Sequence, residues 1–261
     1  MTYVNLENIK NAFSTFRNAE PFPYCVIDNF FTDEVANQLA KEFPNSNSDV
    51  FNGNYFNKIE IKRTCNIWDR FPSTTYNVLQ YLNSQEFLDV LTPLTGHSKL
   101  YADQGLHGGG WHIHPPGGKL NVHLDYSIHP KMKLQRNYNL LVYLNPNYQT
   151  GWGGELGLWS CRNNKPENLD RVLEPKFNRG IIFDTTCNSW HGLEVPNNFP
   201  QGEDRKSIAL YYLTEPPADI SIRGRALFSP SKEQENDQEV LDLIERRSKV
   251  TGQDPTQWSR S

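Results

Sequence analysis

The chain has 261 residues, 37% of them hydrophobic and 21% charged, and a formal net charge of −4. This length suits one large domain with a substantial core or at most two small ones, and we expect one. The slightly acidic balance lacks the basic footprint of nucleic-acid binding, and no window approaches the roughly 18 consecutive apolar residues of a membrane span. The first residues, MTYVNLENIK, contain no apolar signal-peptide core. We therefore expect a soluble, cytoplasmic protein with no nucleic-acid or membrane partner.

Residues 1–97 are expected to form a mixed flank of helices and strands. Leu6, Ile9, Phe13 and Phe16 recur at helical spacing, PFPYCVIDNFF indicates a strand, and a second helix is expected after Thr32. NKIEIKRTC alternates as a strand does, and residues 73–94 predict one or two helices with Ser73 and Ser84 as caps and Gly96 as the stop. Cys25, Cys65, Cys161 and Cys187 form no C-x-x-C pair, which favours buried thiols over a zinc knuckle or disulfides.

Residues 98–216 change character and consist of short β-like runs separated by Gly, Pro and Asn. The runs are KLNVHLDYSI, YNLLVYLN, GGELGLWS, RGIIFDT, HGLEV and RKSIALYYL. Many short strands with turn signals between them predict an all-β sandwich or barrel rather than a parallel βαβ sheet. Residues 217–261 are a polar extension in which QEVLDLIERRSKV predicts one packed helix and GQDPTQWSRS a loose tail.

The strand GKLNVHLDYSI carries polar groups on one of its faces. Strand alternation places His123 and Asp125 on one side and Leu120, Val122, Leu124 and Tyr126 on the other. An isolated H-x-D in a strand is usually an ordinary solvent-facing pair. His191, in TTCNSWHGLEV, is a third ligand that a later strand could bring beside this pair. Two histidines and one carboxylate match the facial triad of non-heme Fe(II) oxygenases, which leaves coordination positions open.

A second group of residues suits a 2-oxo acid bound at such a metal. The far carboxylate of the acid would need a buried cation, and Arg205 fits because a guanidinium grips a carboxylate with two parallel hydrogen bonds. Ser207 lies on the same strand face as Arg205, and Tyr143 offers a phenol from another strand. Without the triad, a lone strand arginine would more simply reach solvent or a structural carboxylate.

These segments, in this order and at these spacings, resemble the Fe(II)- and 2-oxoglutarate-dependent dioxygenases of the prolyl 4-hydroxylase type. The resemblance covers roughly residues 108–214 and extends to PFPYCVIDNFFTDEVANQLAKEFP. It implies a double-stranded β-helix (jelly-roll) core in a mainly β protein with flanking helices. It also implies His123, Asp125 and His191 as iron ligands, and Arg205, Tyr143 and Ser207 around 2-oxoglutarate. The reaction would use O2, release succinate and CO2, and hydroxylate a C–H bond; a need for ascorbate stays open.

The sequence departs from this family where many members carry a tyrosine before a PGG turn. Here His114 takes that position. It could contact the substrate or support a metal ligand, or it could be an ordinary surface or structural histidine. His112 and His114 form a second H-x-H, which we discount as a metal site because no glutamate follows as in cupins. The turn-rich glycines Gly151, Gly153 and Gly154 lack the lysine and helix of a phosphate-binding loop and predict a tight turn.

Two further features have alternative interpretations. Trp190, next to His191, is expected in the core or in the wall of the pocket, where it could shield the oxidant from water. Lys131, Lys133 and Arg136 follow the metal strand, and such a run is usually a solvated loop, although at the mouth of a jelly roll it could contact an acidic or polypeptide substrate.

Three functions follow as hypotheses. The leading one is hydroxylation of a prolyl residue in a protein or peptide, which rests on the family resemblance alone. The second is hydroxylation of a free small molecule such as an amino acid, which would need a closed pocket with charged anchors. The third is a non-catalytic jelly-roll binding protein, which the presence of both the triad and the carboxylate anchor disfavours. Oligomeric state stays open.

Overall fold

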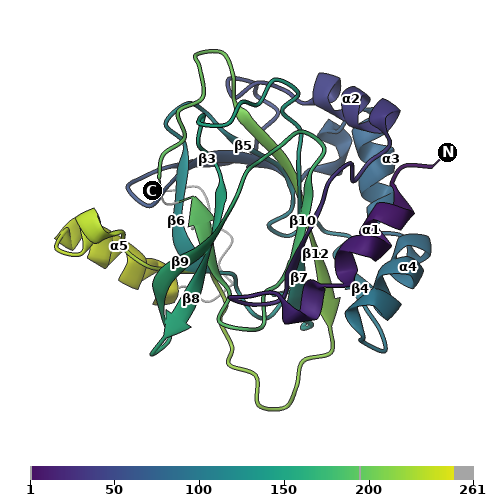
Figure 1. The fold of residues 1–261 in the computed structure, drawn as a ribbon. Coiled ribbons are helices and arrows are strands. Elements are labelled where there is room, and N and C mark those ends of the chain that lie inside the picture. Colours follow the sequence, from purple (N-terminus) through teal and green to yellow (C-terminus); the bar gives the residue numbers. More distant parts are fainter. Residues whose placement is uncertain (1, 194, 250–261) are drawn as a thin grey trace.

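The computed structural model describes residues 2–193 and 195–249, and Figure 1 shows a sheet curled into a half-barrel. Val250 of the predicted C-terminal helix and the predicted loose tail, residues 252–261, lie outside the described residues. In the described part of the chain, the strand pairs are antiparallel and follow the order β1-β10-β7-β12-β5-β3-β6-β11-β8-β9. Three short strands lie off this path, with β13 pairing β6, β2 pairing β3 and β4 pairing β12.

The strands come from all three predicted zones of the chain. They are β1 (Tyr24–Ile27), β2 (Gly53–Phe56), β3 (Glu60–Cys65), β4 (Tyr101–Ala102), β5 (Gly110–His114), β6 (Lys119–Leu124), β7 (Gln135–Tyr143), β8 (Leu156–Arg162), β9 (Lys165–Leu173), β10 (Gly180–Asp184), β11 (Trp190–Leu193), β12 (Arg205–Thr214) and β13 (Leu227–Phe228). The expected β-rich segment is therefore joined in its sheet by β1 to β3 of the N-terminal flank and by β13 of the C-terminal extension.

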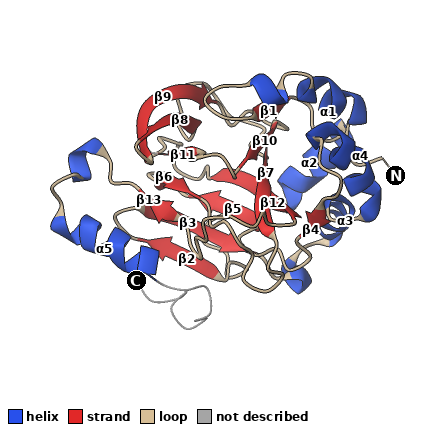
Figure 2. Cartoon of the chain, turned by 90° about the horizontal axis from the view of Figure 1, so that it is seen from below, coloured by secondary structure: helices blue, strands red, loops and turns tan. Residues whose placement is uncertain are grey.

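Helices cover one outer side of this sheet (Figure 2). The helices on this side are α1 (Leu6–Phe13), α2 (Asp33–Glu42), α3 (Ser73–Leu82) and α4 (Gln85–Thr95). The helix α5 (Gln238–Lys249) lies at the opposite end of the sheet. Ser84 caps α4 by accepting a hydrogen bond from the Phe87 N–H, and Gly96 ends it with a φ of 75°, both as predicted. Ser73 is the first residue of α3 rather than its cap. No helix in the described residues is both long and apolar enough to cross a membrane.

The core lies between these helices and the strands β7 and β12. Tyr138, Leu140 and Val142 of β7 pack with Ile208 and Leu210 of β12 in one large cluster that contains residues of α1 to α4. The alternating residues Leu141 and Tyr143 belong to a different cluster on the other face of β7, inside the half-barrel. The period-2 alternation of a strand thus gives one face to packing and leaves the other for a site.

Two expectations about details need correction. Residues 165–173, which were not predicted as a strand, form β9; the strand is largely exposed and its sequence KPENLDRVL lacks an apolar face. Of the four cysteines, Cys25 and Cys65 are buried as expected, whereas Cys161 is half-buried and Cys187 is exposed.

A matched pair of valine substitutions tests where the core lies. Val142 is fully buried in β7, whereas Val172 in β9 is 56% exposed. Val142→Ala is expected to lower the free energy of unfolding by about 2 kcal/mol, because buried methyl groups are lost and a cavity remains. Val172→Ala should change it by less than about 0.5 kcal/mol in urea unfolding measurements. Equal losses in the two variants would contradict this assignment of the core.

Candidate metal centre

The pairing of β6 with β11 brings His123 and His191 together. His191 lies opposite His123, whereas Leu193 lies opposite Leu120, so two steps along β11 match three along β6. This register shift is a β-bulge, which re-aims the side chains on one side of it. Leu120 consequently lines the cavity together with His123, and Tyr126, beyond the end of β6, also lines it. The expectation that Leu120 and Tyr126 share the packing face of Val122 and Leu124 was therefore wrong.

His123, Asp125 and His191 are all buried, and the three ligand atoms that they offer lie within 4.8 Å of one another. The Nε2 atom of His123 is 3.8 Å from Oδ1 of Asp125, and Nε2 of His191 is 4.0 Å from Oδ2. The structure thus unites His123 of β6 and Asp125, just past the end of β6, with a histidine that lies far from them in the sequence. Other groups of three or more His, Cys, Asp or Glu side chains with this spacing are absent from the described residues.

Hydrogen bonds fix which nitrogen of each ring faces the centre. Nδ1 of His123 lies 2.9 Å from the Asn121 carbonyl, and Nδ1 of His191 lies 2.8 Å from the Ser189 carbonyl. A proton on Nδ1 that is donated to a carbonyl leaves the Nε2 lone pair free for a metal. Burial lowers the pKa of His123 to about 3 and also lowers that of His191, so both rings stay neutral near pH 7. The donor set therefore fits Fe(II).

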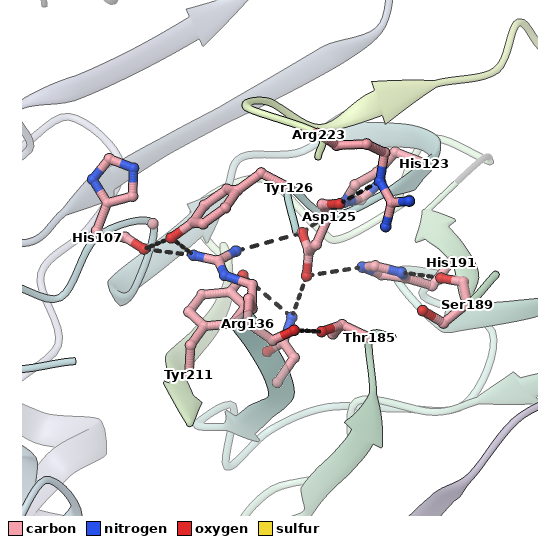
Figure 3. Close-up of polar contacts among 12 residues, drawn as sticks. His107, His123, Asp125, Tyr126, Arg136, Thr185, Ser189, His191, Tyr211 and Arg223 are labelled. Atoms are coloured by element: carbon pink, nitrogen blue, oxygen red, sulfur yellow. Dashed lines mark hydrogen bonds and ion pairs between the residues drawn. The ribbon is translucent and has the colours of Figure 1, made fainter. Parts of the chain in front are cut away.

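The third ligand candidate, Asp125, is held as an anion by its neighbours (Figure 3). Burial alone would raise the pKa of Asp125, but the Arg136 guanidinium and a hydrogen bond from Asn139 help to bring it below its usual value. Nη1 of Arg136 is 3.7 Å from Oδ1, and Nδ2 of Asn139 donates to Oδ2 at 3.3 Å. Arg223 donates from Nε to the Asp125 backbone carbonyl at 3.2 Å.

Arg136 does not lie in a solvated loop with Lys131 and Lys133, which corrects that expectation. It is the second residue of β7 and is 2% exposed. Its guanidinium carbon lies 3.5 Å from the ring centroid of Tyr126 and 3.2 Å from that of Tyr211, a cation–π arrangement on both faces. It also donates hydrogen bonds to the Tyr126 hydroxyl and the His107 carbonyl. Asn139 and Tyr211 could have been identified from the sequence. Every second residue counted back from Tyr143 along β7, or forward from Ser207 along β12, lies on the same inner face.

The predicted carboxylate anchor lies in the same half-barrel. Arg205 is 2% exposed and donates from Nε to the Gly154 carbonyl at 2.6 Å and from Nη2 to the Tyr143 hydroxyl at 3.3 Å. Ser207 is opposite Tyr143 in the pairing of β12 with β7. Within residues 2–193 and 195–249, no ion pair joins Arg205 to a carboxylate. Such a buried cation is costly unless an anion meets it.

The turn at Gly154 lies directly against Arg205. Gly154 has a φ of +76°, and a Cβ atom there would come within 2.8 Å of the Arg205 Cδ. Gly153 also has a positive φ, as the predicted tight turn requires. Gly154 therefore lets the backbone approach Arg205 closely and offers it a carbonyl.

His114 is buried, which rules out the surface alternative. It lies opposite Arg205 in the pairing of β12 with β5, and neither ring nitrogen has a hydrogen-bond partner among the described residues. It lines the cavity, as does His112, whose Nε2 is 3.1 Å from the Gly108 carbonyl. Neither belongs to the His–Asp–His group.

Trp190 does not line the cavity. It packs with Val122, Leu124 and Trp159 in a separate hydrophobic cluster, so Trp190 is a core residue and does not shield the cavity from water.

One cavity of about 160 Å³ connects the His–Asp–His group with Arg205 and Ser207. This volume is similar to that of a cavity that admits benzene, so it suits a small ligand rather than a folded partner. Leu141, Leu156 and Leu193 line its interior, while Tyr55 and Lys62 from β2 and β3 and Arg225 and Arg247 from the C-terminal extension also line it. The last four residues were not expected at the site.

Comparison with known families links this geometry to one enzyme class. The family model described as 2OG-Fe(II) oxygenase superfamily matches residues 109–213. This segment contains all three members of the His–Asp–His group as well as Tyr143, Arg205 and Ser207. No curated protein matches the sequence of the chain.

Solved structures share the fold at low sequence identity. A prolyl-4-hydroxylase from Pseudomonas putida has a TM-score of 0.58 at 14% identity, covering 80% of this chain and 100% of its own. A prolyl hydroxylase from Trichoplax adhaerens, in complex with a hypoxia inducible factor peptide fragment, has 0.53 at 21%, covering 80% and 90%. The carbocyclase SnoK of nogalamycin biosynthesis has 0.54 at 13%, covering 92% and 93%. The predicted mainly β jelly-roll fold with flanking helices is confirmed.

The buried histidines predict how stability depends on pH. Burial lowers the pKa of His114, His123 and His191 below the ordinary 6.5, so the folded protein keeps them neutral where the unfolded chain takes up protons. Their contribution is fully present above about pH 6.5 and is lost as the pH falls below it. Urea unfolding of the metal-free protein should show a lower midpoint at about pH 5.5 than at about pH 7.5. Equal midpoints would contradict neutral buried histidines.

Proposed function

Since residues 109–213 identify the chain as a 2-oxoglutarate-dependent oxygenase, we propose that His123, Asp125 and His191 hold its Fe(II) and that Arg205 holds its cosubstrate. A single observation carries this proposal, namely that two sites share one cavity. The first holds the Nε2 atoms of two histidines and the carboxylate of Asp125. The second holds the buried Arg205 guanidinium, which forms no ion pair with a carboxylate of the described residues. Iron supplies the oxidising chemistry when O2 and 2-oxoglutarate are bound. The balanced reaction converts a substrate C–H, O2 and 2-oxoglutarate into C–OH, succinate and CO2.

The residues of this chain orient the cosubstrate and exclude water. Arg205, kept in place by the Gly154 carbonyl and the Tyr143 hydroxyl, pairs with the distal carboxylate of 2-oxoglutarate, and Ser207 adds a hydroxyl beside it. Leu141, Leu156 and Leu193 line the cavity with apolar surface. A cosubstrate clamped by a charge-assisted pair in an apolar channel has few orientations open to it, which favours one geometry at the metal.

A prolyl residue of a protein or peptide is the leading substrate. The support is the fold likeness to prolyl hydroxylases, among them the one from Trichoplax adhaerens whose structure contains a peptide fragment. Hydroxylation of a free small molecule is the second candidate. The specific observation in its favour is the charged lining contributed by Lys62, Arg225 and Arg247, because charged anchors suit a small ligand.

Substitution of a ligand tests the metal assignment. Asp125→Ala removes the only carboxylate of the His–Asp–His group, and we expect loss of Fe(II) binding and of iron-dependent succinate formation by at least about 100-fold. Metal content after dialysis and succinate release are the measurements. His112→Ala, in the same cavity but outside the group, should retain its iron. Retention of iron by Asp125→Ala would refute the assignment.

Two glycine substitutions test the cosubstrate anchor. Gly154 and Gly151 both have a positive φ, but an added Cβ would meet Arg205 only at Gly154, whereas nothing lies within 4 Å at Gly151. Gly154→Ala should therefore weaken 2-oxoglutarate binding by about tenfold or more, since Arg205 must move, while metal binding persists. Anaerobic titration of the Fe(II) protein with 2-oxoglutarate, followed by its visible absorption band, measures this. If Gly151→Ala weakens binding equally, backbone strain and not Arg205 is the cause.

A further inference from the structure

Residues 221–229, which we name the C-terminal strap, lie along the strand that carries the metal ligands. The Ser127 N–H donates to the Arg223 carbonyl at 2.9 Å, the Ser127 hydroxyl donates to the Ser221 carbonyl at 2.8 Å, and β13 pairs with β6. The Phe228 ring stacks on the His123 ring with centroids 5.2 Å apart. The strap is thus one wall of the cavity next to a proposed iron ligand.

Three cations from separate elements line the cavity on this side. Lys62 comes from β3, Arg225 from the strap and Arg247 from α5. The Lys62 ammonium lies 5.3 Å from the Tyr55 ring centroid, and the Arg247 guanidinium lies 5.0 Å from the ring centroid of Phe228.

The cavity holds more positive than negative charge among its described residues. Its cations are Lys62, Arg136, Arg205, Arg225 and Arg247, and its carboxylates are Glu60 and Asp125. Glu60 is 1% exposed and serves two of these cations at once, with Lys62 at 3.3 Å and Arg247 as a second ion pair. Fe(II) and doubly charged 2-oxoglutarate cancel each other when both are bound. Among these described residues, the excess of positive charge therefore remains when iron and 2-oxoglutarate are bound.

We propose that Lys62, Arg225 and Arg247 form an anion-binding subsite, and that the substrate carries a carboxylate or another acidic group which binds there. This inference rests on the proposed function and specifies its substrate class. Glu60 supplies a single negative charge to Lys62 and Arg247 together, so an acidic substrate gains charge-assisted hydrogen bonds there that an uncharged analogue cannot make. All three cations lie outside the family segment 109–213, so this selectivity belongs to the flank and the extension of this chain.

Binding measurements on the loaded protein test the proposal with simple acids and their amides as probes. The full chain, with Mn(II) in place of Fe(II) to prevent turnover and with saturating 2-oxoglutarate, is dialysed to equilibrium against N-acetylated amino acids as free acids and as primary amides. A parallel set contains N-acetylated tripeptide amides with a central glutamate or glutamine. Mass spectrometry measures retention. We expect at least one acid, free or within a tripeptide, to be retained about tenfold more than its uncharged partner.

Single-residue variants locate the effect. Lys62→Met and Arg225→Gln should each reduce this preference about tenfold or more. Lys58→Met is the matched control, because Lys58 lies just before β3 but pairs with Asp237 and Glu239 outside the cavity. The proposal is overturned if uncharged partners are retained as well as acids, if no acid is preferred, or if Lys62→Met and Arg225→Gln keep the preference. A retained free acid indicates a small molecule, and a retained glutamate tripeptide indicates a peptide.

The same dialysis distinguishes a failure of the proposed function from a failure of the anion-binding subsite. Retention of 2-oxoglutarate in the same dialysis reports on Arg205 and on the proposed function, and it should be equal in the parent protein, Lys62→Met and Arg225→Gln. Loss of 2-oxoglutarate from the parent protein would count against the proposed function. A preference for uncharged probes with 2-oxoglutarate retained would count against the anion-binding subsite alone.

Discussion

The antiparallel pairing of β6 with β11 is the constraint on which the site depends. It sets His191 directly opposite His123, and the bulge in β6 turns Leu120 to the same side as His123. Asp125 follows just past the end of β6, where Arg136 and Asn139 reach it from β7. Without that register the three proposed ligands would not share one side of the sheet, because a slip by one residue would turn His191 outward.

Much of the fold was predictable because its signals are local. The caps of α4, the short apolar runs of β7 and β12 and the glycine turn at residues 151–154 each depend on a few neighbouring residues. The family resemblance then predicted the residues of the inner face, and the structure brings Arg205 beside Tyr143 and His123 beside His191. The strand β9 escaped prediction because its side chains are mostly exposed, which removes the apolar alternation that reveals a strand.

The rest of the site depends on contacts between distant parts of the chain. Arg136 looked like a loop cation because the tyrosines that enclose it, Tyr126 and Tyr211, come from either side of it in sequence and meet only in the folded sheet. Lys62 and Arg247 are separated by most of the chain and are joined through one buried carboxylate, Glu60. No periodicity in the sequence reports such pairings, since they follow from sheet order and from the return of the C-terminal extension to β6.

The alternation of β7 and β12 has a consequence for how the enzyme can lose its site. Leu140 and Val142 pack under the helices, while Asn139 and Leu141 line the cavity and Tyr143 hydrogen-bonds Arg205. The same backbone therefore carries the hydrophobic core and the proposed cosubstrate anchor, and neither can shift alone. On heating, the geometry around Arg205 should stay intact until the sheet itself unfolds. We therefore expect the wall of the cavity formed by β7 and β12 to be lost in one cooperative transition. The opposite wall, formed by the strap, depends on a two-residue strand and one helix, and local opening can begin there.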